Sequence, residues 1–334
     1  MLDSNIEFPW HQKTWDKFSE ARLRNHLPHA LLITGAEGIG KIEFAHKIVK
    51  SLLCLHPKSN ISCDQCNACK TYESGANPDY KEIIVAEDKK QISVDQIRGL
   101  SKFITLSRSF EAYRVILLHP VEAMNLNAAN SLLKSLEEPA ENTIIILLAT
   151  HLSRLLPTIK SRCQLIALPM PTSIQALKWL NTQAPQLEFA TELLDMSYGR
   201  PLLALDINKD DFKQRNELAD DILQLILEHK SITEIAKKWE KLDHAALLKW
   251  QASWLQSFIK EAVMKVANNT VTIKEQDENL NKINSLISEE QQWVLYQKII
   301  EQQQYIHTSV NPLIFMENML TLWFQASHQC RNSD

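Results

Sequence analysis

Ala30-Leu31-Leu32-Ile33-Thr34-Gly35-Ala36-Glu37-Gly38-Ile39-Gly40-Lys41-Ile42 is the stretch that decides the fold of this sequence. The apolar run at 30–34 predicts a short buried strand, and apolar positions at helical spacing over 44–52 predict a helix after it. Between them, Gly35, Gly38, Gly40 and Lys41 match a phosphate-binding loop of the pattern Gly-x4-Gly-Lys-Ser/Thr. The alternative is an ordinary glycine-containing turn, and the strand–loop–helix context argues against it.

The last position of this loop departs from the pattern. A Ser or Thr hydroxyl there normally holds Mg²⁺, and Ile42 has no ligating atom. The apolar run at 114–118 predicts another buried strand, which in a phosphate-loop ATPase should end in Asp-Glu. Here it ends in His119-Pro120. We therefore expect weak or absent binding of ATP or ADP and no hydrolysis, although Lys41 and the glycines remain able to hold a phosphate.

Strand and helix patterns alternate through the first half of the chain. Strands are expected at 80–85, 114–118 and 143–150, and a helix at 127–138 is stopped by Pro139. Ser93 and Gln96 form a capping-box pattern at the start of another helix. This alternation predicts a parallel α/β sheet. Residues 212–329 show only helical periodicity, so the expected fold class is α/β followed by all-α. Aromatic residues in this part, Trp293 and Tyr296 among them, are expected in the core.

Four of the six cysteines are clustered in the sequence at Cys54, Cys63, Cys66 and Cys69. Their spacing, Cys-x8-Cys-x2-Cys-x2-Cys, suits four thiolates around one tetrahedral zinc ion. A site closed by four protein ligands would be structural and would leave no open position for catalysis. Unligated thiols, a redox Cys-x-x-Cys pair, and His56 as a substitute ligand are the alternatives.

Composition restricts the function classes. The formal net charge is −4, which argues against strong autonomous binding of nucleic acid, because such proteins normally carry a basic surface. No apolar run approaches the roughly 18 residues of a membrane span, and the first residues lack the pattern of a signal peptide. We expect a cytoplasmic protein without a membrane partner, whose cysteines are metal ligands or free thiols rather than disulfides.

Two further segments carry a family resemblance. Leu155-Leu156-Pro157-Thr158-Ile159-Lys160-Ser161-Arg162-Cys163 resembles the Ser-Arg-Cys loop of the AAA+ clamp-loader subunits of bacterial DNA polymerase III, and Asn130–Pro139 is similar to the helix before that loop. With the cysteine spacing, the resemblance covers residues 10–205. It implies an AAA+ phosphate-loop domain at 1–166 with a zinc knuckle at 54–69, a helical lid at 167–207 and a helical oligomerisation collar at 208–334.

The same resemblance implies a role for individual residues. In this family the Ser-Arg-Cys arginine, here Arg162, contacts ATP bound by a neighbouring motor subunit, and Ser161 and Cys163 would orient its loop. Thr150 matches a nucleotide-sensing position. The lid arginine of the motor subunits aligns with Leu202, and its neighbour Arg200 is out of register. A local salt bridge is the alternative role for Arg162.

The family's motor subunits, gamma and tau, keep Thr at position 42 and Asp-Glu at positions 119–120. The resemblance therefore implies a subunit that does not hydrolyse ATP itself. Its partners would be the motor subunits and the delta subunit, and, through the complex, the sliding clamp and primed DNA during replication by the DNA-directed DNA polymerase holoenzyme. Two alternatives remain: an active motor ATPase, and an independent zinc-dependent binder of nucleic acid.

Overall fold

The computed structural model describes residues 7–86, 89–207, 209–266, 278–305 and 311–329. The chain divides into two compact units. One comprises Met1–Ala190 with Gly199–Ala204, and the other Thr191–Tyr198 with Leu205–Asp334. The three-part division expected from the sequence stays a prediction. The polar stretch at 274–281 suggests a loop, but its described part, from Glu278 onward, is the start of helix α13 (Glu278–Leu286); residues 274–277 and the tail at 330–334 lie outside the described residues.

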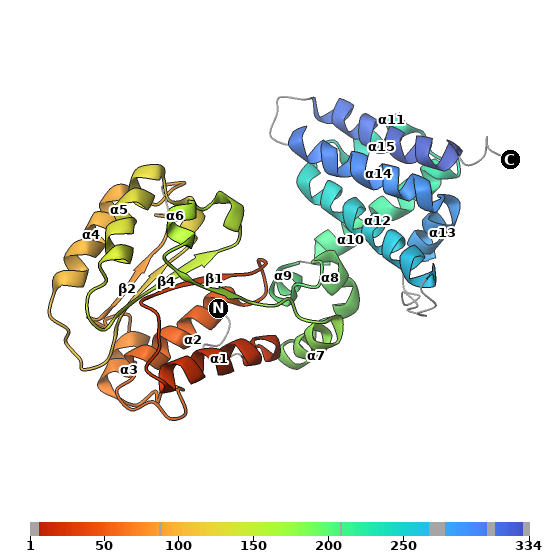
Figure 1. Cartoon of the computed structure of the whole chain (residues 1–334). Coiled ribbons are helices and arrows are strands. Elements are labelled where there is room, and N and C mark those ends of the chain that lie inside the picture. Colours follow the sequence, from red (N-terminus) through yellow and green to blue (C-terminus); the bar gives the residue numbers. More distant parts are fainter. Residues whose placement is uncertain (1–6, 87–88, 208, 267–277, 306–310, 330–334) are drawn as a thin grey trace. The chain divides into compact units, whose positions relative to one another are not determined.

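The first unit is built on a five-stranded sheet in the order β2-β3-β4-β1-β5 (Figure 1). All neighbouring strands are parallel. The strands are β1 (Ala30–Thr34), β2 (Tyr80–Ile83), β3 (Arg114–Leu118), β4 (Thr143–Ala149) and β5 (Gln164–Ala167). The expected parallel sheet is confirmed, although the second strand ends at Ile83 rather than at 85.

Helices cover both faces of this sheet. Leu32 of β1 lies in the cluster that contains Ile97 and Leu132 from the helices on one face. Leu31, next to it in the strand, lies in the cluster that contains Phe18 and Ile48 from the other face. Successive strand side chains point to opposite faces, so an entirely apolar strand can be buried on both. The helices of this unit are α1 (Gln12–Leu23), α2 (Lys41–Leu53), α3 (Asn67–Glu73), α4 (Val94–Thr105), α5 (Leu126–Glu137), α6 (Pro157–Lys160) and α7 (Ser173–Gln183).

Local sequence signals agree with these helix ends. The Ser93 hydroxyl accepts from the backbone N–H of Gln96, whose side chain accepts in return from the Ser93 backbone, and the capping box is confirmed. The helix expected at 127–138 is α5, displaced by one residue at each end. Short one-turn helices lie at η1 (Pro9–His11), η2 (Val121–Ala123) and η3 (Leu152–Arg154).

A buried ion pair joins the start of β3 to the residue before β2. Arg114 Nη2 lies 3.3 Å from Asp79 Oδ1, and both side chains are almost fully buried. Arg114 also donates to three carbonyl groups at the end of α4 and in the loop that follows it. Asp79 accepts from the backbone N–H groups of Ser109 and Phe110. These contacts satisfy the backbone of a loop that lacks regular structure.

All the regular secondary structure among the described residues of the second unit is helical. Its helices are α8 (Ala190–Met196), α9 (Pro201–Asp206), α10 (Lys209–Ile226), α11 (Ile232–Trp239), α12 (His244–Val266), α13 (Glu278–Leu286), α14 (Glu289–Gln302) and α15 (Pro312–Gln329), with the short η4 (Gln303–Tyr305); α8 and α9 begin in the first unit. Trp239, Trp254 and Trp323 are fully buried, as expected. Trp293 is an exception, because 54% of it is exposed and its ring stacks on Tyr296.

Asp221 and Gln251 are two of the polar residues buried in this helical core. Asp221 is buried and accepts from Lys230, Lys238 and the indole of Trp239 at 2.6–2.8 Å. Gln251 accepts from the Trp323 indole at 2.6 Å. Asp221 and Gln251 therefore both have donors, as is usual for buried acceptors. Among the described residues, every helix is too short or too polar to span a lipid bilayer.

Candidate functional site

The phosphate-binding loop connects β1 to α2 with the geometry that the motif requires. Gly38 and Gly40 have φ angles of +76° and +88°, in the left-handed region where a side chain is strained. Lys41 opens α2, and its Nζ donates to the carbonyl oxygen of Ala36 within the loop at 2.8 Å. Burial lowers the pKa of Lys41. The four predicted loop residues are thus assembled at the amino end of one helix, where backbone N–H groups attract anions.

Apolar side chains lie against this loop. A Cβ atom added to Gly40 would lie 2.8 Å from the ring of Phe8. One added to Gly38 would overlap Leu203, and the backbone N–H of Leu202 donates to the Gly38 carbonyl at 3.0 Å. The glycines are therefore needed for close approach as well as for their backbone angles.

The two positions that should bind magnesium hold other chemistry. Ile42 is 44% exposed at the start of α2 and carries only carbon. His119, at the end of β3, has its Nε2 2.7 Å from Glu82 Oε1 on the edge strand β2. This hydrogen bond lowers the pKa of Glu82. The strand end that should present an acidic pair is therefore occupied by an imidazole bound to a neighbouring strand.

One acidic residue near the loop was missed by the sequence analysis. Glu122, in η2, accepts from the backbone N–H groups of Thr150 and His151 at 2.8 and 3.2 Å through its Oε1. Its Oε2 is buried without a hydrogen-bond partner, and its charge raises the pKa of Lys41 against the effect of burial. The structure thus joins Thr150 to the phosphate-loop region through Glu122. A single Glu in the apolar segment after Pro120 was the available signal.

The Ser-Arg-Cys segment follows α6. Arg162 Nη2 lies 2.7 Å from Glu137 Oε1 at the end of α5, and its Nη1 donates to the Thr158 carbonyl at 3.0 Å. Ser161 donates to the same carbonyl at 3.1 Å. Cys163 packs against the core cluster under α5 and α6. The local salt bridge considered for Arg162 is therefore present, and its neighbours hold the turn in place.

Arg162 and the phosphate loop lie at opposite ends of the neighbouring parallel strands β5 and β1. Arg162 precedes β5, whose first residue, Gln164, pairs with Leu31 near the start of β1. The phosphate loop follows the end of β1 at Thr34. At about 3.3 Å per residue, the length of β1 alone separates these two ends of the strands by roughly 13 Å. Arg162 therefore does not belong to the same site as Lys41.

The four predicted zinc ligands converge in space. Their sulfur atoms all lie within 4.8 Å of one another, with 3.4 Å between Sγ of Cys66 and Sγ of Cys69. Tetrahedral zinc with Zn–S bonds of about 2.3 Å separates its sulfurs by roughly 3.8 Å. Backbone N–H groups of Cys63 and Cys66 point at the sulfurs of Cys54 and Cys63. The donor set fits a structural metal ion that accepts four thiolates.

The charges of this cluster also call for a cation. Burial raises the pKa of the Cys54 and Cys69 thiols. At Cys63, by contrast, the backbone N–H of Gln65 lowers the pKa to about 6. Four thiolates this close repel one another unless a metal ion compensates them. All four are free of disulfides.

Comparisons with known proteins agree with this architecture. A family model described as DNA polymerase III, delta subunit, matches residues 10–172. DNA polymerase III subunit delta′ of Pseudomonas aeruginosa is 32% identical over 325 residues, which cover 95% of this chain and 97% of that protein.

This chain belongs to the DNA polymerase III delta-prime family.

Other relatives match shorter parts of the chain. The delta-prime subunit of Escherichia coli K12 is 29% identical over 63% of this chain and 63% of that protein. DNA polymerase III subunit tau of Bacillus subtilis is 35% identical over 43% of this chain and 25% of that protein. The parallel sheet with its phosphate loop agrees with the α/β fold expected for the first part of this delta-prime chain.

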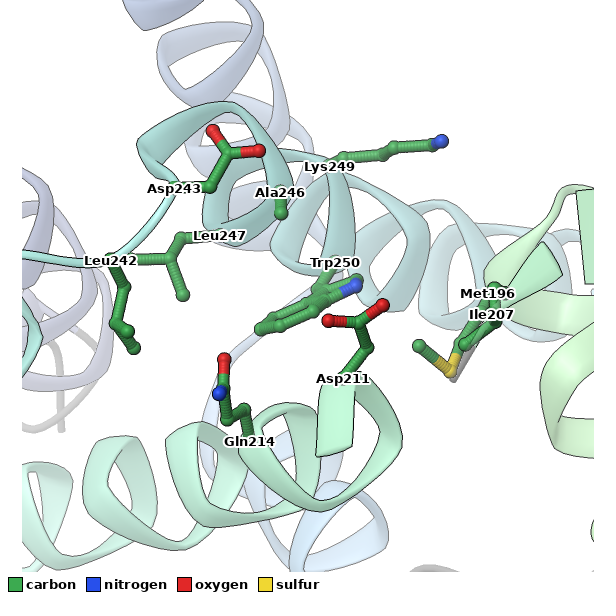
Figure 2. A pocket seen from close by; sticks show the side chains of 10 residues that line it. All are labelled: Met196, Ile207, Asp211, Gln214, Leu242, Asp243, Ala246, Leu247, Lys249 and Trp250. Atoms are coloured by element: carbon green, nitrogen blue, oxygen red, sulfur yellow. The ribbon is translucent and has the colours of Figure 1, made fainter. Parts of the chain in front are cut away.

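The helical unit of this delta-prime chain contains a cavity of about 220 Å³. Asp211 and Gln214 of α10 face Trp250 of α12 across it, and Met196 of α8 lies at one end (Figure 2). Its lining mixes carboxylate, amide and apolar groups. None of the residues predicted to be functional lies in it.

Proposed function

We propose that this chain is a clamp-loader subunit that does not hydrolyse ATP and that lends Arg162 to ATP bound by a neighbouring motor subunit. It would act in a complex with gamma or tau and with delta, in the cytoplasm, to load the sliding clamp onto primed DNA. The proposal rests on one combined observation: the phosphate loop lacks the usual magnesium-binding side chains, and Arg162 lies at the opposite end of the strands from that loop.

The chemistry at Ile42 and His119 supports the absence of hydrolysis. Phosphoryl transfer relies on Mg²⁺ to neutralise charge between the outer phosphates, and on a hydroxyl and an acid to hold it. An aliphatic side chain cannot replace that hydroxyl, and His119 is bound to Glu82. Phe8 and Leu203, packed against the loop, further reduce the room for a nucleotide. Binding of ATP or ADP should therefore be weak or absent.

The position of Arg162 supports action in trans. The length of strand β1 separates it from the phosphate loop of its own chain, so its guanidinium would act on a nucleotide held by another subunit. A guanidinium is permanently charged and matches the oxygens of a γ-phosphate in geometry. Its side chain is 35% exposed, which leaves it accessible to a partner. Ser161 and Cys163 would hold the loop that presents it.

Zinc would have a structural role in this proposal. Cys54, Cys63, Cys66 and Cys69 would hold the ion and tie the end of α2 to α3. A closed four-sulfur site contributes folding energy and has no position for a substrate. Residues 167–207 would serve as the lid and 208–334 as the collar through which subunits assemble.

Replacing Arg162 by Ala in the reconstituted complex tests the proposal. Turnover at the interface that Arg162 serves should fall by about 10³-fold or more, as when other trans-acting arginines are lost, while assembly is unchanged. Arg154→Ala, which removes an exposed arginine at the end of the short helix η3, is the matched control and should have no effect. An unchanged DNA-stimulated ATPase rate in Arg162→Ala would refute the proposed action of Arg162 on a neighbouring subunit's ATP.

The intact Lys41 and glycines favour one competing function, an active motor ATPase. The purified chain alone distinguishes the two. The proposal expects no turnover of ATP above background, whereas a motor would hydrolyse ATP and lose that activity on Lys41→Ala. An activity sensitive to Lys41 would replace the present proposal.

A further inference from the structure

Arg162 is held by its own chain. Its Nη2 lies 2.7 Å from Glu137 Oε1, and its Nη1 donates to the Thr158 carbonyl. Both terminal nitrogens of the guanidinium are therefore engaged. A γ-phosphate approaching from another subunit would meet a guanidinium whose charge Glu137 already balances.

Glu137 occupies an unfavourable place for an acid. It is the last residue of α5, where the carbonyl ends of the helix carry partial negative charge and disfavour a carboxylate. The adjacent Glu138 has the same disadvantage and makes no ion pair in the part of the chain that the structure describes. Arg162 thus compensates specifically the carboxylate of Glu137, and nothing in the local helix explains that acid otherwise.

We infer that Glu137 is a latch that keeps Arg162 docked on its own subunit until a neighbouring triphosphate displaces it. This inference rests on the proposed role of Arg162 and adds a residue that regulates it. Phosphate and carboxylate bind the same nitrogens of a guanidinium. They therefore compete, and repulsion between Glu137 and the phosphate forces the ion pair to open before full contact.

The exposure of the pair determines the size of the effect. The side chain of Arg162 is 35% exposed and that of Glu137 is 49% exposed. Ion pairs in such surroundings are screened by water and are weak. The latch should therefore restrain Arg162 by only about two- to fivefold. A bound triphosphate can open the ion pair between Glu137 and Arg162 readily. At an interface without bound triphosphate, the ion pair stays closed.

The test compares Glu137→Gln with Glu138→Gln in the reconstituted complex, with ATP as the probe. Glutamine keeps the size of the side chain and removes the charge. Without DNA, Glu137→Gln should raise the ATPase rate by about two- to fivefold, and Glu138→Gln should leave it unchanged. At saturating DNA and clamp, where the latch is already open, both variants should match the unmodified complex. Glu137→Ala provides a second substitution, and gel filtration checks assembly.

A double substitution shows whether Glu137 acts through Arg162. In the Arg162→Ala background, Glu137→Gln should have no effect, because the group it restrains is gone. If Glu137→Gln lowers the ATPase rate, or leaves it unchanged while Arg162→Ala still impairs the complex, the latch is wrong. The proposed action of Arg162 on a neighbouring subunit's ATP would then still stand. No effect of Arg162→Ala would instead overturn the proposed function and the latch together.

Discussion

Replacing Asp79 by Ala should destabilise the sheet unit strongly. Asp79 is 1% exposed and Arg114 is 2% exposed. The substitution would leave the Arg114 guanidinium buried without its counter-charge, and would remove the acceptor for the backbone N–H groups of Ser109 and Phe110. Breaking a buried ion pair on one side costs about 3–5 kcal/mol.

Several contacts of Arg114 reduce that cost. The guanidinium keeps its bonds to the carbonyls of Ile104, Leu106 and Ser107, at 2.7–2.9 Å. We therefore expect a loss near 3 kcal/mol, at the lower end of the range. For a domain of about 150–250 residues this corresponds to a fall in Tm of roughly 6–12 °C.

Urea unfolding followed by circular dichroism measures the change. The control is Asp95→Ala, which removes an exposed acid 3.7 Å from Arg98 and should cost less than about 1 kcal/mol. Combining Asp79→Leu with Arg114→Met should recover part of the loss, since no charge is then left unpaired. If Asp79→Ala costs no more than the Asp95 control, the reasoning about this buried pair is wrong.

Two further predictions concern the metal cluster and a buried histidine. Metal analysis should find about one zinc per chain, and Cys69→Ser should lower that content and the stability of the sheet unit; a stable, metal-free unmodified protein would contradict the site. Burial lowers the pKa of His11 to about 3. Below pH 6.5 the unfolded chain therefore binds a proton at this histidine, whereas the folded chain does not. The free energy of unfolding should then fall by about 1.4 kcal/mol per pH unit because of this group. The fall of roughly 2 kcal/mol between pH 6.5 and 5 should be absent in His11→Phe; equal pH slopes in the two proteins would show that His11 is protonated when folded.

The phosphate loop and the cysteine cluster were predictable because their chemistry depends on spacing along the chain. Glycines with positive φ, a lysine at a helix start and paired Cys-x2-Cys turns are local features, and each appears where the motif placed it. The apolar strands were predictable for the same reason, since an uninterrupted apolar run of strand length indicates a strand buried on both faces. The ends of strands were predicted less accurately, as at Ile83, because hydrogen bonding to the neighbouring strand decides where a strand ends.

Contacts between segments that are distant in the sequence could not be predicted from such local patterns. The packing of elements against one another decides the position of Glu122 near the end of β4, the contact of Phe8 with Gly40, and the exposure of Trp293.

The sequence alone determined what the chain lacks and what it carries: no hydroxyl at position 42, no acid at 119, four cysteines in register, and an arginine in a Ser-Arg-Cys segment. Only the tertiary structure decided where that arginine lies. The parallel pairing of β5 with β1 places Arg162 at the end of the strands opposite the phosphate loop, and the packing of α5 beside α6 gives it Glu137 as a partner. Strand direction and helix packing are long-range properties, and no local pattern of residues encodes them.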